Sequence, residues 1–344
     1  MAHSISTLSE FFTPQCDTII DVRSPSEFAE DHIPGAVNLP VLDDDERAEV
    51  GTIYIQDSPF KARKLGAALV AKNAALHLQG PLAEKDGSWT PLVYCWRGGQ
   101  RSGSFATILS QVGWRARVID GGYRAYRRMV VQSLYEDAFD PKVFLIDGNT
   151  GTAKTDILQA FAGLGGQIVD LEGLAHHRGS LFGGFVDGQP SQKSFESALA
   201  KCLAGLDPRR PVLIEAESSK IGDLLVPPSL WSAMKGAPRI GVSASLEARS
   251  KYLAQAYADL TKDADRLSQV IEKLRPYYAA GQIAQWLDLA RGGGFEALAA
   301  SLMEVHYDPR YRKAMADRVS TVDLSELNEA EIARAARHIA GFLN

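Results

Sequence analysis

The chain has 344 residues, of which 45% are hydrophobic and 23% are charged, a composition typical of a globular protein with about two domains. Because 37 Lys and Arg residues stand against 42 Asp and Glu residues, the net charge of −5 excludes a uniformly basic nucleic-acid coat but allows a local basic patch. No apolar run approaches the roughly 18 residues of a membrane span, and we expect neither a secretory signal nor a membrane partner. The cysteines Cys16, Cys95 and Cys202 are too far apart for CxxC-type metal spacing, so we expect reduced thiols in a cytoplasmic enzyme.

Short apolar runs alternate with helical stretches in the first part of the chain. Residues 18–22, 92–95 and 115–119 predict strands, and residues 61–76 predict a helix because leucines recur there at helical spacing. Such alternation predicts an α/β domain in which helices cover the faces of a parallel sheet. We assign this domain to residues 1–138.

The second part of the chain predicts another α/β unit, which we assign to residues 139–344. Its expected strands are short and apolar, and they cover residues 142–147, 167–170, 211–215 and 239–242. From Glu247 onward the pattern is largely helical, so we expect a helical C-terminal part after the sheet.

Cys95 lies in a glycine-rich loop between a predicted strand and a predicted helix. Gly98 and Gly99 let the loop curl so that its backbone N–H groups face inward, and the N-terminus of the following helix adds positive charge. Arg97 and Arg101 add two formal charges. These surroundings lower the pKa of a thiol, favour the nucleophilic thiolate and bind a tetrahedral oxyanion. We therefore interpret Cys95 as the catalytic residue, although most free cysteines are buried structural residues.

Three segments resemble the rhodanese domain family. The resemblance covers nearly all of residues 5–130, and the segments that carry it are residues 21–28, 32–40 and 120–126. It implies a rhodanese-like parallel-sheet domain whose loop cysteine either carries sulfur as a persulfide or acts as a phosphatase nucleophile.

The spacing within the loop separates these two activities. Five residues lie between Cys95 and Arg101, one more than in the common sulfurtransferase loop, so the loop is similar to that of rhodanese-fold phosphatases. A loop of this length should admit a phosphate-sized anion. We interpret Asp21, Arg23 and Glu27, in the first of the family segments, as structural ion pairs and caps.

A phosphate-binding pattern, GxxxxGK[ST], follows a predicted strand in the second domain and opens a helix. Backbone N–H groups of such a P-loop cradle a diphosphate, Lys154 neutralises its oxygens, and the Thr155 hydroxyl is suited to Mg²⁺, which is the one metal we consider. Ala153 stands where the pattern has glycine, which is tolerable at helical backbone angles and unfavourable at positive φ. We therefore expect diphosphate binding rather than fast nucleotide turnover, by Gly148, Asn149, Thr150, Gly151, Thr152, Ala153, Lys154 and Thr155.

Further polar residues of the second domain are candidates for a site. Glu215 and Glu217 end a predicted strand, and they either contact Mg²⁺ through water or cap the strand end. His177 belongs to a pair of adjacent histidines whose spacing does not suit a metal, whereas Arg178 suits a phosphate or tRNA contact. Lys220 lies in a similarly polar, cationic stretch.

A negatively charged protein needs a local basic patch to bind RNA. Aromatic side chains interleaved with arginines suit base stacking and phosphate contact, and a solvated helix end is the alternative interpretation. The tRNA-contact candidates are Arg124, Arg127, Arg128, Tyr307, Arg310, Tyr311, Arg312 and Lys313.

The chain resembles the bacterial tRNA 2-selenouridine synthases over almost its whole length. The resemblance rests on the two loops and on residues 177–180, 189–192, 215–218 and 307–311. The resemblance implies that selenium from selenophosphate replaces the sulfur of wobble 2-thiouridine in tRNA, by way of S-geranylation with geranyl diphosphate. It implies two cosubstrates, no tightly bound cofactor, and two partners, which are the thiolated tRNA and the enzyme that produces selenophosphate.

Three other classes of function remain open. A rhodanese-type phosphatase would explain the loop from Cys95 to Arg101 but not the P-loop. A sulfurtransferase fused to an NTP-dependent kinase would explain both loops. A non-catalytic RNA-binding module would need neither Cys95 nor Lys154.

Overall fold

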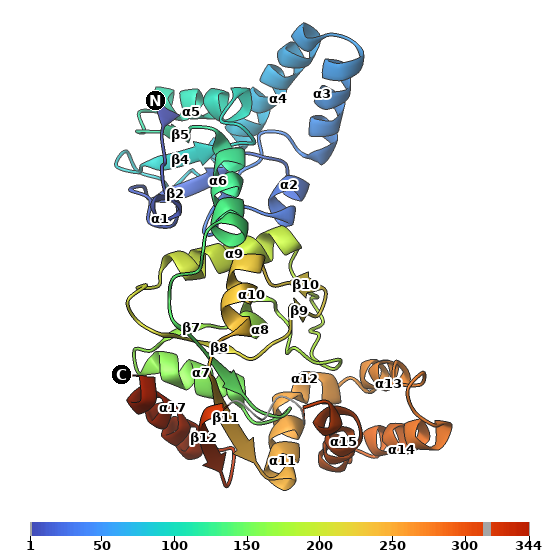
Figure 1. Ribbon diagram of the computed structural model, residues 1–344. Helices are drawn as coiled ribbons and strands as arrows, with labels where there is room; N and C mark the ends of the chain where they lie inside the picture. Colours follow the sequence, from blue (N-terminus) through green and yellow to red (C-terminus); the bar gives the residue numbers. More distant parts are fainter. Residues whose placement is uncertain (1, 312–317, 344) are drawn as a thin grey trace. The chain divides into compact units, whose positions relative to one another are not determined.

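The computed structural model describes residues 2–311 and 318–343, with the backbone alone for Ala2 and Tyr311. The chain forms two compact units (Figure 1). The first unit contains Met1–Ala138 together with Pro190–Gly205, and the second contains Phe139–Gln189 together with Leu206–Asn344. Residues 190–205, which we assign from the sequence to the second domain, thus belong to the first unit.

The first unit is built on a five-stranded sheet with the strand order β1-β5-β4-β2-β3. All neighbouring strands are parallel, as the alternation of strands and helices predicts. β4 is buried along its whole length, which agrees with its continuous apolar sequence. The strands are β1 (Ala2–His3), β2 (Thr18–Asp21), β3 (Val37–Asn38), β4 (Pro91–Tyr94) and β5 (Arg117–Ile119).

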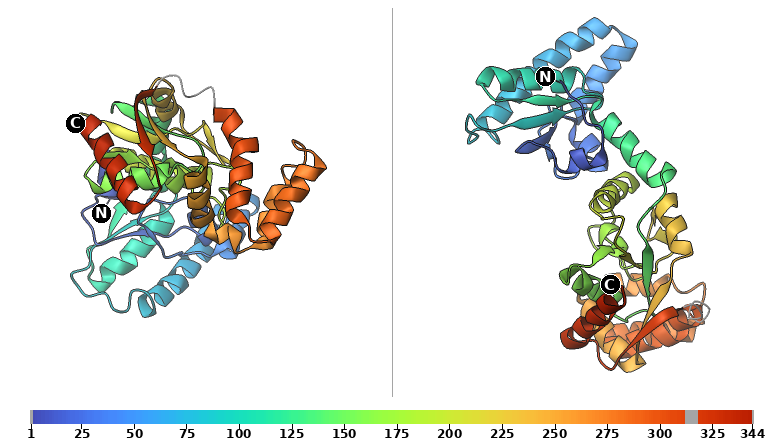
Figure 2. Two further views of the ribbon diagram at one scale, coloured as in Figure 1. Left: turned by 90° about the horizontal axis from the view of Figure 1, so that it is seen from below. Right: turned by 60° about the vertical axis from the view of Figure 1, so that its left-hand side comes forward.

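Helices connect the strands of this sheet. α3 packs against α4, and the two form a hairpin that extends beyond the sheet (Figures 1 and 2). The hydroxyl of Ser58 caps α4, which begins at Pro59, a residue suited to the first helical position. The helices are α1 (Leu8–Phe12), α2 (Pro25–Glu30), α3 (Asp44–Gln56), α4 (Pro59–Gln79), α5 (Gln100–Val112), α6 (Gly122–Val131), the π-helical turn η1 (Gln132–Glu136) and α9 (Gln192–Ala204).

α9 packs against α1 and α6 of the first unit. Its buried face includes two polar side chains, Glu196 and Ser197. Glu196 pairs with Arg127 and accepts a hydrogen bond from the Tyr135 hydroxyl at 2.6 Å. The Ser197 hydroxyl donates to the Asp31 carboxylate at 3.0 Å. These specific polar contacts, which a buried carboxylate requires, attach α9 to the first unit.

The second unit is built on a second five-stranded parallel sheet, with the order β12-β11-β6-β8-β7, and a short antiparallel pair, β9 and β10. Its strands are β6 (Val143–Asp147), β7 (Gln167–Val169), β8 (Val212–Glu215), β9 (Lys220–Ile221), β10 (Leu224–Leu225), β11 (Arg239–Ala244) and β12 (Arg318–Leu324). Its helices are α7 (Lys154–Gly163), α8 (Leu171–Leu174), α10 (Pro228–Lys235), α11 (Leu246–Ala256), α12 (Ala258–Thr261), α13 (Ala264–Glu272), α14 (Ala280–Arg291), α15 (Phe295–Leu302), η2 (Met303–Tyr307), α16 (Asp308–Tyr311) and α17 (Glu329–Leu343).

β12 differs from the helical pattern that we expect after Glu247. It pairs with β11 at the edge of the sheet, and only its last residues, around Val322 and Leu324, are buried on one face. Such a short alternation of buried and exposed positions is typical of an edge strand and gives a weak sequence signal. The α/β class of both units and the helical character of the rest of the C-terminal part are confirmed.

The second unit has two apolar clusters. One lies between the sheet and the helices α7 and α17, and includes Ile157, Leu213 and Ile339. The other joins the helices α12 to α15 around Trp286, which is fully buried. Within residues 2–311 and 318–343, no helix has both the length and the apolar character needed to cross a membrane.

Candidate active sites

Cys95 directly follows β4, where the chain leaves the sheet for the loop that precedes α5. Its side chain is only 4% exposed, and its Sγ lies 3.1 Å from the Oγ of Ser102. Burial alone would raise the pKa of this thiol. Hydrogen bonds from the Ser102 hydroxyl and from the backbone N–H groups of Ser102 and Arg97, together with the charge of Arg101, outweigh burial and lower the pKa of Cys95. The loop therefore favours the thiolate.

Two glycines let the start of α6 support this loop. Gly98 has a φ of +69°, and a Cβ there would lie 2.6 Å from the carbonyl oxygen of Ile119. Gly122 has a φ of +55°, and a Cβ there would lie 2.3 Å from the carbonyl oxygen of Cys95. The same carbonyl accepts a hydrogen bond from the Tyr123 N–H at 2.9 Å. Glycine at both positions is thus required by close backbone approach as well as by positive φ.

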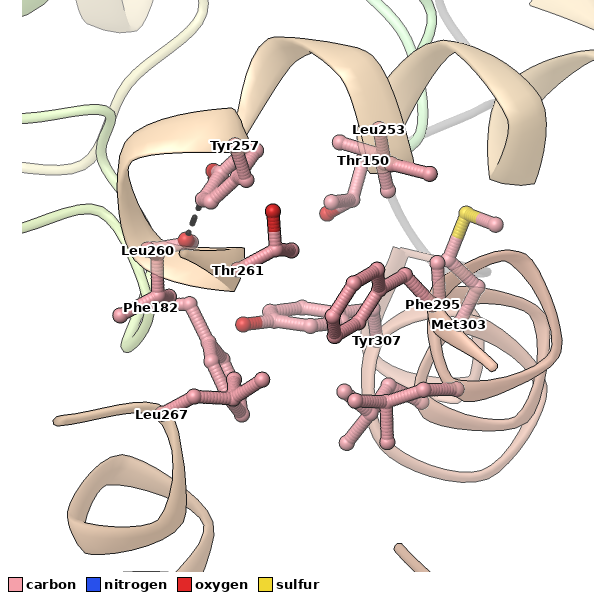
Figure 3. Close-up of a pocket in the computed structure, with 15 residues that line it drawn as sticks. Thr150, Phe182, Leu253, Tyr257, Leu260, Thr261, Leu267, Phe295, Met303 and Tyr307 are labelled. Carbon is pink, nitrogen blue, oxygen red and sulfur yellow. Dashed lines mark hydrogen bonds between the residues drawn. The ribbon is translucent and has the colours of Figure 1, made fainter. Parts of the chain in front are cut away.

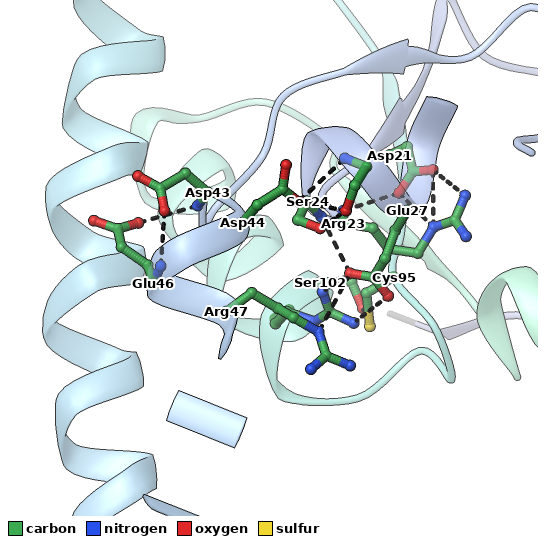
Figure 4. Close-up of polar contacts among 12 residues, drawn as sticks. Asp21, Arg23, Ser24, Glu27, Asp43, Asp44, Glu46, Arg47, Cys95 and Ser102 are labelled. Atoms are coloured by element: carbon green, nitrogen blue, oxygen red, sulfur yellow. Dashed lines mark hydrogen bonds and ion pairs between the residues drawn. The ribbon is translucent and has the colours of Figure 1, made fainter. Parts of the chain in front are cut away.

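Figure 4 shows the polar contacts beside Cys95. Arg101 pairs with Glu27 at 2.7 Å, and Glu27 also accepts a hydrogen bond from the Ser24 N–H at the start of α2. Burial would raise the pKa of Glu27, but these partners lower it, so the carboxylate is charged and neutralises part of the Arg101 charge. Arg97 is exposed and has no side-chain partner within the described part of the chain. Arg97 is therefore the more available cation for an incoming anion.

Asp21 and Arg23 form a buried ion pair with an N–O distance of 2.6 Å. Arg23 also donates to the carbonyl oxygen of Asp31 and lies 4.0 Å from the centroid of the Tyr123 ring. Because neither member of the pair reaches solvent, the pair fixes the turn after β2 and does not face a substrate. The structural roles that we expect for Asp21, Arg23 and Glu27 are confirmed.

In the second unit, the P-loop connects β6 to α7, which begins at Lys154. The Nζ of Lys154 donates to the carbonyl oxygen of Gly148 at 3.0 Å. Thr155 occupies the next position, and its hydroxyl donates to a carboxylate oxygen of Glu172 at 3.2 Å. Both side chains thus lie at the N-terminus of α7, where the helix dipole and free N–H groups favour an anion.

The backbone of this loop includes two left-handed residues. Gly151 has a φ of +84°, and a Cβ there would lie 2.9 Å from the Leu253 side chain. Ala153 is buried and has φ +55° and ψ +34°. Alanine is unfavourable at a positive φ, as noted for this position of the P-loop pattern. Ala153 is therefore strained at the position where the common pattern has glycine.

Residues outside the loop hold it in place. The side-chain amide of Asn149 donates to Asp308 at 3.0 Å. Arg249, on α11, pairs with Asp308 at 2.8 Å and donates to the carbonyl oxygen of Thr150 at 3.2 Å. Sequence reasoning missed this pair, because nothing in either local segment indicates that the two residues meet. Asp308 positions the P-loop.

Two carboxylates face the start of α7. A Cβ at Gly179 would lie 2.8 Å from oxygens of both Glu172 and Glu217, so the two groups converge on this glycine. Burial and repulsion by Glu217, only partly offset by Lys154, raise the pKa of Glu172 to about 8. Sequence reasoning missed Glu172. The available signal was its place just after a strand, at the same edge of the parallel sheet as the P-loop.

The two glutamates at the end of β8 have different surroundings. Glu215 is fully buried and accepts a hydrogen bond from the Leu171 N–H at 2.9 Å, so it joins β8 to α8. Burial raises its pKa well above the usual value. Glu217 instead lines the cavity around the P-loop. Of the two alternatives, contact with an ion or capping, the geometry gives the capping role to Glu215.

His177 and Arg178 also line the P-loop cavity. Burial lowers the pKa of His177, which favours the neutral ring at neutral pH. Arg178 pairs with Asp259 at 2.7 Å and lies 4.1 Å from the centroid of the Phe185 ring. Lys220 does not line the cavity; it is exposed and pairs with Asp223 at 3.5 Å.

The P-loop cavity has a volume of about 790 Å³. Its wall combines residues 150–156 with Glu172, His177, Arg178 and Glu217. This volume lies within the range of small-molecule sites and exceeds the needs of a diphosphate alone. In the described ranges, no three acidic, histidine or cysteine side chains are placed to hold a metal by themselves.

The candidate tRNA contacts have different environments. Arg124 and Arg128 are exposed on α6, where they are available to phosphate. Arg127 is less available than these two, because its guanidinium is half-buried against the carboxylate of Glu196, and its contact with tRNA stays a prediction.

The C-terminal tRNA-contact candidates also differ in their surroundings. Tyr307 lines an apolar cavity of the second unit, and its role in base stacking stays a prediction. Arg310 is exposed and lies 3.1 Å from a ring nitrogen of His306. The side chain of Tyr311, and Arg312 and Lys313 as a whole, lie outside the described residues.

Comparisons with known proteins find matches to both of the domains that contain these loops. Residues 5–129 match the family model of the rhodanese-like domain, and residues 141–280 match that of the tRNA 2-selenouridine synthase AAA domain. The chain is 36% identical over 324 residues to a tRNA 2-selenouridine synthase of Hahella chejuensis, covering 92% of this chain and 77% of that protein. A tRNA 2-selenouridine synthase of Alcanivorax borkumensis is 31% identical over 347 residues, covering 91% of this chain and 93% of that protein. The chain belongs to the tRNA 2-selenouridine synthase family.

Membership in this family makes the chain a tRNA-modifying enzyme. A third relative, from Shewanella denitrificans, is 33% identical over 332 residues and has the same description, with 94% of this chain and 87% of that protein covered. The matched segments include Cys95 and the whole P-loop, so both sites lie within the family's shared sequence.

Proposed function

We propose that this enzyme replaces the sulfur of 2-thiouridine at the wobble position of tRNA with selenium, and that selenophosphate and geranyl diphosphate are its cosubstrates. The observation that carries the proposal is the stabilised thiolate of Cys95 inside an anion-binding loop. The same chain has a second anion-binding loop, around Lys154, in its other unit. Two such loops suit a reaction that uses two different phosphate-containing donors.

The first step takes place at the P-loop. The thiouridine sulfur attacks the first carbon of geranyl diphosphate, so a C–S bond forms, a C–O bond breaks, and diphosphate leaves. Lys154 and the N-terminus of α7 stabilise the charge that develops on the leaving group. The base loses its N3 proton, and the ionised member of the Glu172 and Glu217 pair, which lines the same cavity, accepts it.

Magnesium fits this site as an accessory ion. Thr155 and Glu172 would supply hard oxygen ligands of the kind that Mg²⁺ prefers, the diphosphate would complete the coordination, and Glu217 would remain free to accept the proton. When bound, the ion would supply positive charge to the leaving diphosphate.

The second step uses the Cys95 loop. Selenophosphate binds with its phosphate oxygens against Arg97 and the inward-facing N–H groups. The Cys95 thiolate attacks phosphorus, the P–Se bond breaks, and selenide is released. Selenide adds to C2 of the S-geranylated base, and the C–S bond breaks to release geranylthiol. Water then cleaves the S–P bond on Cys95 and gives phosphate, so no oxidant is needed. If the thiolate attacked selenium instead, an S–Se bond would form and the electron pair of the P–Se bond would stay on phosphorus. Phosphorus would then have to leave at a lower oxidation state.

Purified protein, thiolated tRNA and the two cosubstrates provide the test, with nucleosides analysed by mass spectrometry. Geranyl diphosphate alone should give S-geranyl-2-thiouridine, and addition of selenophosphate should convert it into 2-selenouridine. An acid-quenched reaction with ³²P-labelled selenophosphate should leave label on wild-type protein and none on Cys95→Ala. Formation of 2-selenouridine at the same rate without geranyl diphosphate would contradict the proposal. Turnover of ATP in its place would favour a kinase.

A further inference from the structure

A second cavity adjoins the P-loop cavity, and the helical cluster of the second unit forms most of its wall. Its wall comes from α11, α12, α13, α15 and η2, together with Phe182 and the P-loop residue Thr150. Figure 3 shows side chains from these separate segments pointing into one space. Leu260, Leu267, Leu298 and Leu302 form much of its lining, and all four are buried.

The wall of this cavity is apolar. Among the residues that the structure describes, this wall contains no charged side chain, and its polar groups are hydroxyls such as that of Thr261. A nucleotide base and its ribose would need several hydrogen-bonding partners wherever this apolar wall covers them, because unpaired buried polar groups are costly. An apolar chain has no such requirement, and apolar cavities bind apolar molecules in preference to water.

The two cavities share part of their walls beside the P-loop. Thr150, Ser180, Leu253 and Tyr257 line both of them. A ligand whose anionic head lies at the N-terminus of α7 can therefore extend its other end past Thr150 into the apolar cavity. This juxtaposition suits a molecule that has a diphosphate at one end and a hydrocarbon at the other.

The size of the cavity limits the length of that hydrocarbon. Its volume is about 70 Å³. Since a single water requires about 10–15 Å³ on this scale, the cavity has room for roughly five to seven groups of that size. A chain of one or two isoprene units matches this space when its first carbons remain near the P-loop, whereas a chain of three units does not.

The geometry points to a chain-binding subsite in this apolar cavity, which holds the hydrocarbon of the allylic diphosphate and limits its length. The inference rests on the proposed function for the identity of the head group. Ala299, on α15, lines the cavity and is half-buried, whereas Ala297 on the same helix is exposed. Phe295, at the start of α15, also lines it.

Binding measurements on the full chain test this subsite. Isothermal titration calorimetry would compare inorganic diphosphate with the dimethylallyl, geranyl and farnesyl diphosphates. Ala299→Phe fills the cavity, and Ala297→Phe is its matched control. We expect Ala299→Phe to weaken geranyl diphosphate binding by about tenfold or more, since each buried CH₂ contributes about fourfold in affinity. Binding of inorganic diphosphate should be unchanged in both variants.

A cavity-widening variant tests the length limit separately. Phe295→Ala should improve the affinity for farnesyl diphosphate relative to geranyl diphosphate. Equal geranyl diphosphate affinity in wild type and Ala299→Phe would overturn the subsite, and so would an equal loss of inorganic diphosphate binding. A selective loss of ATP binding in Ala299→Phe would also overturn it, in favour of a base site. Absence of S-geranyl transfer by wild type would refute the proposed function instead, because the binding series does not depend on transfer.

Discussion

Removal of the Ser102 hydroxyl should raise the pKa of the Cys95 thiol. Ser102 is fully buried near the start of α5, and its Oγ lies 3.1 Å from the sulfur. A hydrogen bond to a charged group contributes about 1.5–3 kcal/mol, and about 1.4 kcal/mol corresponds to one pKa unit, so Ser102→Ala should raise the pKa of Cys95 by about one to two units. The backbone N–H groups and the charge of Arg101 persist in the variant, so part of the depression should persist too.

The pH dependence of thiol alkylation measures this change. The rate of iodoacetamide reaction would be followed in a Cys16→Ser, Cys202→Ser background, in which Cys95 is the sole cysteine. Ser104→Ala is the matched control, because Ser104 lies on the same helix and is exposed. A midpoint that does not move in Ser102→Ala, or that moves equally in Ser104→Ala, would refute a specific role for the Ser102 hydroxyl.

Three further predictions follow from the strained alanine, the raised carboxyl pKa and the arginines of α6. Ala153→Gly should stabilise the protein by roughly 0.5–1 kcal/mol, because relief of left-handed strain exceeds the added chain entropy of glycine; a lower thermal midpoint would contradict this. Because the folded chain raises the pKa of Glu172 from 4.5 to about 8, it holds that proton more tightly than the unfolded chain does. The free energy of unfolding should therefore fall as pH rises through this window, and Glu172→Gln should remove that loss; denaturant titrations with equal pH dependence would disprove it. Replacing Arg124 and Arg128 with glutamate should weaken tRNA binding and reduce its salt slope by up to about one unit per lost phosphate contact, whereas Arg127→Ala should chiefly lower stability, by roughly 1–3 kcal/mol. Filter binding with unchanged slopes in the first variant would place the RNA surface elsewhere.

The parts of the structure that depend on local sequence could be predicted. The strand, loop and helix around Cys95 and around Lys154 have the expected order, because apolar runs and glycine-rich turns carry strong local signals. The structural role of Asp21 and Arg23 could also be predicted, since a charged side chain at the end of a buried strand is costly to bury unless it pairs with an opposite charge.

Features that depend on distant residues could not be predicted in the same way. The buried face of α9 meets partners that are far away in the sequence, such as Arg127, and its helical pattern is the same whichever unit it joins. Likewise, the brace formed by Arg249 and Asp308 becomes visible only when α11 and α16 are placed beside the P-loop. The tyrosine and arginine pattern near Tyr307 suggested stacking on RNA, but helix packing turns this tyrosine toward an apolar cavity.

A comparison of Cys95→Ala and Lys154→Ala tests the division of chemistry between the two loops most directly. Both variants would receive thiolated tRNA, geranyl diphosphate and selenophosphate, and the nucleosides would be quantified by mass spectrometry. Cys95→Ala should accumulate S-geranyl-2-thiouridine and form no 2-selenouridine, because only the selenium step needs the thiolate. Lys154→Ala should form little of either product, since a single preorganised charge contributes roughly 2–4 kcal/mol to transition-state stabilisation. Formation of 2-selenouridine by Cys95→Ala at the wild-type rate would contradict this division.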